Sequence, residues 1–202
     1  LAQTPAAPSC PALLDHQLFL PEPWYEPTPE AKDRRDKAHV PEDLPFRTKP
    51  RIAAELVRAV AVLGTVVLDW IVADEEYGRP GHFLDEVEAL EQRYVVEVPV
   101  TTAVWTADPA SCVPAYSGRG RVPTAPARDA VRTVAALAAE LPTSAWRALQ
   151  VREGATGPLV FEFAAVRVWA IRQSKPGPPA WVLIRRSLEA QPEVKYYVSN
   201  AG

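Results

Sequence analysis

Apolar residues recur at helical spacing between Arg51 and Leu63. Four of them fall on one helical face: Ile52, Leu56, Val60 and Leu63. Pro50 suits a first turn because it has no backbone N–H to leave unsatisfied, and Gly64 can end a helix in a left-handed conformation. The pattern therefore predicts a helix over residues 51–63.

The chain then switches between strand and helix patterns. Val66 to Ala73 is rich in β-branched residues without clean alternation, which predicts a strand that is covered on both faces. His82 to Gln92 repeats an apolar face at helical spacing, and Tyr94 to Val98 is again typical of a strand. Strand, helix and strand in so short a span predict a right-handed βαβ unit with two parallel strands.

Strand patterns dominate further along the chain. An Ala-rich segment from Asp129 to Leu141 predicts a helix, which Pro142 ends. Four later segments predict the strands of an antiparallel meander, with turns at residues 154–158 and 174–179: residues 148–152, 159–171, 181–185 and 196–199. The expected fold class is therefore α/β, with an α/β portion followed by a β-rich portion.

The remaining segments have weaker patterns. Residues 1–11 are rich in Ala and Pro and are expected to be poorly ordered, whereas residues 12–20 have strand-like apolar content. Residues 21–50 hold many prolines, which predicts mostly loop with one helical turn. Residues 101–126 are expected to be irregular.

Composition indicates an ordinary globular protein, since 48% of the 202 residues are hydrophobic and 23% are charged. The longest nearly apolar run, residues 59–68, is far shorter than the roughly 20 residues that a membrane helix needs. We therefore expect no membrane helix, and two cysteines that suggest no disulfide framework fit a reducing, intracellular setting. The two cysteines form no C-x-x-C pair, and the three histidines are isolated, so no zinc-ligand spacing appears. The sequence also has no P-loop and no G-x-S-x-G motif.

The charge is distributed unevenly along the chain. Residues 1–114 contain 10 basic and 19 acidic side chains, whereas residues 115–202 contain 12 basic and 6 acidic ones. A basic carboxy-terminal half is typical of a protein that meets a polyanion. Solvated strand faces produce the same asymmetry, so charge alone leaves both interpretations open.

The stretch DWIVADEEYGRP, residues 69–80, ends an apolar run in three carboxylates. In open α/β sheets, functional groups collect at the carboxyl ends of strands. Asp74 is the first acid after the apolar run, and Glu75 is expected on the opposite side of the strand. A carboxylate in this position is a candidate ligand for the Mg²⁺ ions of a two-metal nuclease site. The alternative is that Asp74 is a solvated loop residue or caps a helix.

Six segments of the chain, taken in order, carry a resemblance to a known family. They are DHQLFLPEPW (15–24), VPEDLPFRTKPRIA (40–53), WIVADEEYG (70–78), YVVEVPVTTAVW (94–105), VREGATGPLVFEFAAVRVW (151–169) and WVLIRRSLEAQPEVKYYVSN (181–200). Together they resemble the catalytic region of bacterial insertion-sequence DDE transposases, whose nuclease core has a ribonuclease-H-like fold. The resemblance covers nearly the whole chain from about residue 12.

The resemblance implies that three acidic residues hold the catalytic metal ions and that Asp74 corresponds to the second of them. The first acid would lie before residue 1 and the third after Gly202, so the chain is expected to be an internal fragment that is inactive by itself. The absence of any Met in the sequence fits this expectation. Residues 12–100 would form a partial ribonuclease-H-like core, and residues 101–200 a β-rich insertion.

The implied activity is DNA cleavage and strand transfer with Mg²⁺ or Mn²⁺, by a homodimer that binds transposon-end and target DNA in the bacterial cytoplasm, at the nucleoid. Trp105 could stack on an extruded base or pack in the core. Five basic residues are candidate phosphate contacts: Arg119, Arg121, Arg185, Arg186 and Lys195.

Two other functions stay open. The chain could be a non-catalytic transposase remnant, either inert or DNA-binding. It could also be part of a hydrolytic nuclease of the same fold, which needs the same acids but joins no DNA ends.

Overall fold

The computed structural model describes residues 12–79, 81–154 and 157–202. The predicted disorder of residues 1–11 lies outside this range. The chain divides into two compact units between Val67 and Leu68, and each unit is described by itself. Within the described residues, no helix has the length and apolar character needed to cross a lipid bilayer.

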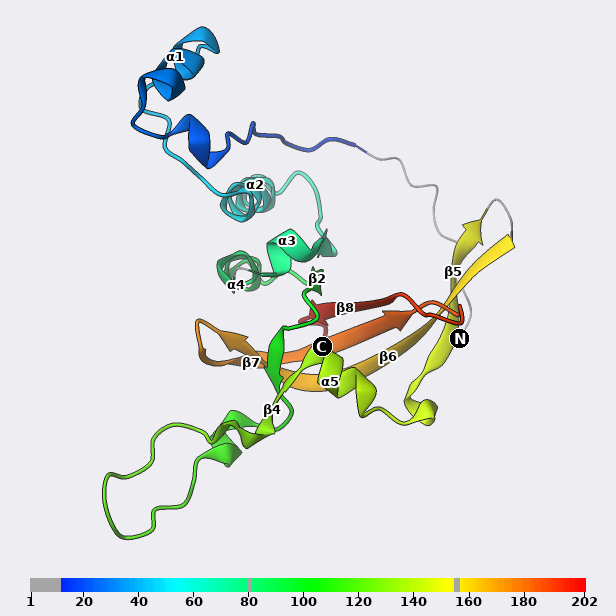
Figure 1. Cartoon of the computed structure of the whole chain (residues 1–202). Helices are drawn as coiled ribbons and strands as arrows, with labels where there is room; N and C mark the ends of the chain where they lie inside the picture. Colours follow the sequence, from blue (N-terminus) through cyan, green and yellow to red (C-terminus); the bar gives the residue numbers. More distant parts are fainter. Residues whose placement is uncertain (1–11, 80, 155–156) are drawn as a thin grey trace. The chain divides into compact units, whose positions relative to one another are not determined.

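The first unit contains the 3-10 helix η1 (Glu22–Trp24) and the helices α1 (Pro29–Lys37) and α2 (Lys49–Leu63) (Figure 1). The predicted helix over residues 51–63 is confirmed as α2, which begins two residues earlier. It ends at Gly64, whose φ of 63° is the left-handed conformation that glycine adopts readily. Ile52 and Ala54 on α2 are buried.

Two predictions for the first unit are wrong. Helix α1 has nine residues where one helical turn was expected, because Thr28 caps it and Pro29 occupies its first position. The Thr28 hydroxyl accepts a hydrogen bond from the Ala31 backbone N–H at 3.2 Å. Residues 12–20 form no strand, and most of their side chains are exposed. A strand needs a partner edge, and no described strand pairs with this segment.

The second unit is built on one mixed sheet of eight strands in the order β1-β2-β8-β7-β6-β3-β4, with β5 also paired to β6 (Figure 1). The strands are β1 (Ile71–Ala73), β2 (Tyr94–Val98), β3 (Ala103–Trp105), β4 (Val131–Thr133), β5 (Arg147–Gly154), β6 (Gly157–Arg172), β7 (Lys175–Arg186) and β8 (Val194–Ser199). Strands β1 and β2 are parallel, and the other described pairings are antiparallel. The sheet therefore continues across residue 100, through the β2–β8 pairing.

The predicted βαβ unit is confirmed. The parallel strands β1 and β2 are connected along the chain by the helices α3 (Glu75–Gly78) and α4 (Gly81–Ala89). Helix α3 lies very close to β2, because a Cβ added at Gly78 would come within 2.1 Å of the Glu97 carbonyl oxygen and near the side chains of Val96 and Val98. This close approach requires a glycine at residue 78.

Strand β1 is shorter and more exposed than predicted. It spans three residues where eight were expected, and Val72 is 76% exposed. The expectation of a strand covered on both faces is therefore wrong for this unit. The physical reason is that β1 is the end strand of the described sheet, with β2 as its one partner.

The core of the second unit lies on the face of the sheet that α3 covers. Alternate residues of β2 are buried, namely Tyr94, Val96 and Val98, as the two-residue period of a strand requires. Further buried side chains come from β6, β7, β8 and α4: Val168, Ala170, Ala180, Val182, Ile184, Val198, Phe83, Leu84 and Val87.

The predicted helix over residues 129–141 is wrong in its first half. Residues 128–130 form the 3-10 helix η3, and β4 follows because Val131 and Thr133 pair with β3. Helix α5 (Val134–Ala139) then begins at Thr133, whose hydroxyl accepts a hydrogen bond from the Ala136 backbone N–H at 3.2 Å. In residues 131–133, pairing with β3 therefore outweighs the helix propensity of the Ala-rich segment.

The four predicted meander strands are confirmed as β5, β6, β7 and β8, all with longer bounds. The predicted turn at residues 174–179 is too long. The chain reverses at Gln173 and Ser174, which both have positive φ, and β7 begins at Lys175 with three prolines in its first five residues. Those prolines are tolerated because β8 pairs with β7 only from Trp181 onward, so this part of β7 is an edge.

Candidate functional site

Asp74 lies directly after β1, at the carboxyl end of the parallel strand pair. It is the N-cap residue of α3: its Oδ1 accepts a hydrogen bond from the Glu76 backbone N–H at 3.0 Å. The side chain is exposed. The helix-cap interpretation of Asp74 is thus correct as local structure, and it leaves the second carboxylate oxygen facing solvent.

The two neighbouring carboxylates take other roles. Glu75 is the first residue of α3 and forms an ion pair with Arg79 one turn later. The expectation that Glu75 points to the opposite side of the strand is therefore wrong, because the strand has already ended at Ala73. Glu76 is exposed on the first turn of α3.

The carboxylate at this strand end is the type of ligand that a hard divalent cation prefers, but too few such ligands are grouped here. Mg²⁺ takes oxygen ligands, and Asp74 offers one exposed carboxylate. Within the described ranges, however, no three His, Cys, Asp or Glu side chains are grouped so that they could hold a metal ion. A two-ion centre needs more than one carboxylate. These residues alone therefore do not form such a centre, and no reaction step follows from them.

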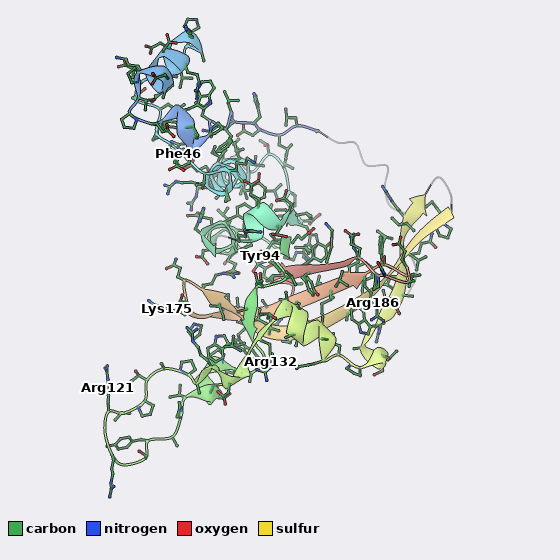
Figure 2. The ribbon with its side chains drawn as sticks, in the orientation of Figure 1. Phe46, Tyr94, Arg121, Arg132, Lys175 and Arg186 are labelled. Carbon is green, nitrogen blue, oxygen red and sulfur yellow. The ribbon has the colours of Figure 1, made fainter. Side chains whose placement is uncertain are left out.

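The five basic residues predicted to contact DNA fall into two groups. Arg119 and Arg121 are exposed in the long segment between η2 (Pro109–Cys112) and η3, and in the described part of the chain neither forms an ion pair. Figure 2 shows Arg121 on this extended loop, whereas Arg186 lies on the sheet. Arg185, Arg186 and Lys195 lie on β7 and β8, and each faces a carboxylate.

Two residues of this second group form close ion pairs across the strands. Arg186 Nε lies 2.7 Å from Glu162 Oε2, and its guanidinium carbon lies 3.8 Å from the centre of the Trp146 ring. Lys195 Nζ lies 3.0 Å from Glu97 Oε1, and this hydrogen bond raises the pKa of Lys195. Arg186 and Lys195 are thus compensated within the fold, which lowers their value as phosphate contacts.

Trp105 is 4% exposed on β3, where it is paired with Trp169 of β6 and Val131 of β4. The indole ring is enclosed by the sheet and its neighbours. This placement favours core packing over stacking on an extruded base.

Sequence reasoning missed a partly buried polar cluster between β6 and α4. The Tyr94 hydroxyl donates a hydrogen bond to Glu88 Oε1 at 2.7 Å, and Arg172 contacts both groups. Arg172 Nε also lies 3.3 Å from Asp85 Oδ1. Burial raises the pKa of Tyr94, so the hydroxyl stays protonated and keeps donating to Glu88 at neutral pH. Arg172 lies 84 positions after Glu88 in the sequence, so no local pattern could reveal the cluster.

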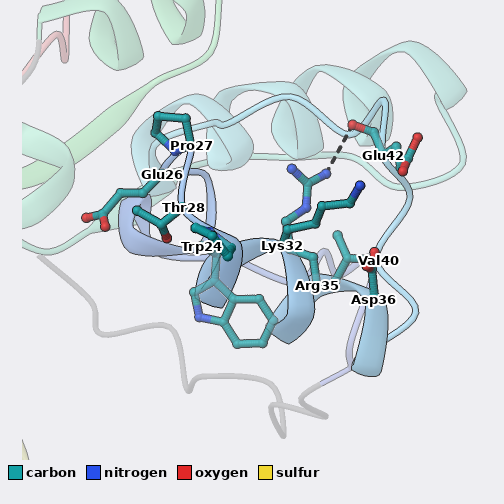
Figure 3. A pocket seen from close by; sticks show the side chains of 10 residues that line it. Trp24, Glu26, Pro27, Thr28, Lys32, Arg35, Asp36, Val40 and Glu42 are labelled. Atoms are coloured by element: carbon teal, nitrogen blue, oxygen red, sulfur yellow. Dashed lines mark hydrogen bonds between the residues drawn. The ribbon is translucent and has the colours of Figure 1, made fainter.

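The first unit contains a cavity of about 530 Å³, shown in Figure 3. Trp24 and the basic side chains of Lys32 and Arg35 line it together with three acidic side chains, so the cavity does not select one sign of charge. Arg35 is engaged in the structure, because it donates to the backbone carbonyls of Pro41 and Glu42 at 2.6 and 3.1 Å. We interpret this cavity as part of the packing between η1 and α1.

Comparison with known proteins identifies the family. No sequence in the curated collection matches this chain. The model of the DDE superfamily endonuclease family matches residues 5–158, about three quarters of the chain, and the match includes β1, Asp74, the βαβ unit and β5. The mixed α/β architecture is consistent with the ribonuclease-H-like fold of such domains. The chain therefore belongs to the DDE superfamily endonuclease family.

Proposed function

We propose that this chain is part of the catalytic region of a DNA transposase that cleaves DNA and joins DNA ends with the help of Mg²⁺ or Mn²⁺. The observation that carries the proposal is the position of Asp74, an exposed carboxylate at the carboxyl end of the parallel β1–β2 pair, inside the region that matches the family. Such a strand end is where open α/β sheets place functional groups.

In this proposal Asp74 is one ligand of the metal site. Its Oδ1 is held by the Glu76 backbone N–H, which fixes the carboxylate plane and leaves Oδ2 for a cation. Divalent ions would neutralise charge on the phosphodiester and activate the attacking oxygen. Because one carboxylate cannot hold two ions, further acidic side chains must complete the site. We infer that the 202 residues by themselves do not cleave DNA.

The proposed partners are transposon-end and target DNA, bound by two copies of the protein in the bacterial cytoplasm. Within this scheme residues 12–100 act as the partial core and residues 101–200 as an insertion that contacts DNA. Arg119 and Arg121 are the best-supported phosphate contacts, because both are exposed without a compensating carboxylate in the described structure. Arg186, Lys195 and Trp105 are weaker candidates, since they are paired or buried, and Arg185 is weaker because its side chain is only 24% exposed.

The test uses the intact protein that carries this sequence, assayed for cleavage and joining of DNA bearing transposon ends in the presence of Mg²⁺. Asp74→Asn is expected to reduce the rate more than about 100-fold, because changes around a metal ligand already cost about 10–100-fold. Asn is as good a helix N-cap as Asp, so the fold should not change.

Asp108→Asn is the matched control. Asp108 caps η2 with the same geometry, since its Oδ1 accepts a hydrogen bond from the Ala110 backbone N–H at 2.9 Å, but it does not follow a parallel strand. Equal activity of the two variants would contradict the role of Asp74. Hydrolysis without any joined product would instead favour a hydrolytic nuclease.

A second test reads the coding DNA on both sides of this sequence. An open frame with an Asp-bearing strand upstream and a Glu-bearing helix downstream would supply the missing ligands. An open frame that encodes neither acid would contradict the assignment of Asp74, and stop codons or frameshifts would mark the gene as a remnant.

A further inference from the structure

A cavity of about 720 Å³ lies on the second unit's sheet, on the face opposite α3. On β2, Val96 and Val98 face Gly78 of α3, so Val95, which lines the cavity, points to the other side. The cavity extends over β5, β6, β7 and β8, and residues 144–145 form part of its wall. Its volume falls within the range of about 300–1,000 Å³ that small-molecule sites occupy.

One cross-strand row places two cations in this cavity. Phe163 of β6 is directly paired with Arg147 of β5 on one side and with Arg185 of β7 on the other. All three side chains line the cavity. Because neighbouring strands lie about 4.8 Å apart, the two arginine backbones are separated by about 10 Å, with the aromatic ring between them.

These two cations have little compensation. No Asp or Glu lines the cavity in the described structure. Arg147 forms no ion pair with a described residue and is exposed. Arg185 has one loose ionic contact, at 3.8 Å from Glu193, and rests 4.5 Å above the centre of the Phe161 ring. Its Nε is buried without a hydrogen-bond partner among the described residues, and an unsatisfied buried donor is costly.

The rest of the lining is mostly apolar. Leu183, Ala165 and Val95 extend the surface that starts at Phe163, and Tyr197 adds a hydroxyl beside them. Burial raises the pKa of Tyr197, so this hydroxyl is protonated at neutral pH and able to donate a hydrogen bond. An apolar surface with a few convergent donors is the usual composition of a ligand site.

We propose that this cavity binds an amphipathic anion: a small molecule with an aliphatic or aromatic body that covers Phe163 and Leu183, and one carboxylate or phosphate group that Arg147 and Arg185 hold. A negative group fits because both arginines line the cavity, whereas no Asp or Glu is among its described lining residues. An apolar body fits because covering the apolar lining removes it from water, which is favourable. The proposal does not depend on the nuclease function, which is assigned to Asp74 at the carboxyl end of the β1–β2 pair.

The test is calorimetric titration of the intact protein that carries this sequence with decanoate, and in parallel with 1-decanol, which has the same apolar chain and no charge. We expect saturable one-site binding of decanoate and at least about ten-fold weaker binding of decanol, because hydrogen bonds between charged partners are roughly twice as strong as neutral ones. Arg147→Gln and Arg185→Gln should each weaken decanoate binding about ten-fold and leave decanol binding unchanged.

Two further variants keep the test decisive. Arg128→Gln removes an exposed arginine outside the cavity and should not change either affinity. Ala165→Phe places a bulky ring in the cavity lining and should weaken the binding of both ligands. Three results would overturn the proposal. Decanoate and decanol could bind equally well, decanoate binding could survive both arginine substitutions, or neither ligand could bind. A dimer that decanoate cannot dissociate would also overturn it, because the face would then be covered by a second copy.

Discussion

The guanidinium of Arg172 lies 3.1 Å from the hydroxyl of Tyr94, and both groups contact the same Glu88 oxygen. Arg172 ends β6, whereas Glu88 belongs to α4, so this contact ties the long hairpin to the βαβ unit. The sheet and its helices are therefore joined by polar contacts as well as by the apolar core.

Replacing Arg172 should destabilise the second unit. Arg172→Met keeps most of the apolar stem but leaves Glu88 and Asp85 without their cation, and breaking a buried ion pair typically costs about 3–5 kcal/mol. Because the Asp85 carboxylate is 40% exposed, we expect a loss at the lower end of this range, about 3 kcal/mol. Urea unfolding measures this difference. Lys175→Met, at the exposed end of the same hairpin, is the control and should change stability little.

Tyr94 should make stability fall at alkaline pH. The folded-state pKa of Tyr94 is raised, chiefly by burial, so the folded chain holds a proton that the unfolded chain releases near pH 10. Stability from this group is complete below about pH 10 and decreases above it, by at most about 1.4 kcal/mol for each pH unit. Unfolding followed from pH 8 to 11 should show this decrease. Tyr94→Phe should reduce the slope; an unchanged slope would contradict the assignment.

Gly78→Ala adds only one methyl group but should destabilise the second unit strongly. The added methyl group would lie 2.1 Å from the Glu97 carbonyl oxygen, so α3 would have to move away from β2. Overpacking of this kind costs about 1–3 kcal/mol, and we expect the upper end because the neighbour is backbone. Thermal unfolding provides the measurement. Gly202→Ala, where a Cβ meets nothing within 4 Å, should leave the melting temperature unchanged.

The cap formed by Asp74 allows its structural and chemical roles to be separated. Asp74→Ala should cost about 1 kcal/mol, because the Glu76 N–H loses its acceptor. Asp74→Asn should keep the cap and change stability by only a few tenths of a kcal/mol. Circular-dichroism melts of both variants test this pair, and equal destabilisation would show that the charge, rather than the cap, matters for folding.

Strand β1 should promote self-association of the isolated chain. It ends the described sheet, and Val72 exposes an apolar side chain beside its hydrogen-bonding edge. Such edges pair with other chains unless a charge or proline blocks them. Light scattering at increasing concentration should detect aggregates, and Val72→Lys should reduce them. A cooperative melt of a stable monomer would contradict this expectation.

The sequence by itself determined the elements whose pattern is local. Helix α2 and strand β2 lie where periodicity predicted them, because an apolar face at a fixed spacing suits one regular structure and a capping glycine ends it. The position of Asp74 after an apolar strand was equally readable. The six ordered segments that resemble DDE transposases were enough to indicate the family whose model matches residues 5–158.

Tertiary structure decided the features that depend on a distant partner. Val131 and Thr133 joined the sheet because β3 lies beside them, and the prolines of β7 fit because β8 does not reach that far. Arg186 and Lys195 look like phosphate contacts in sequence, yet Glu162 and Glu97 compensate them across the strands. Arg147 and Arg185 lie 38 residues apart and meet only through Phe163. Charge and pairing in a sheet act between residues that are remote in sequence, and no local pattern records them.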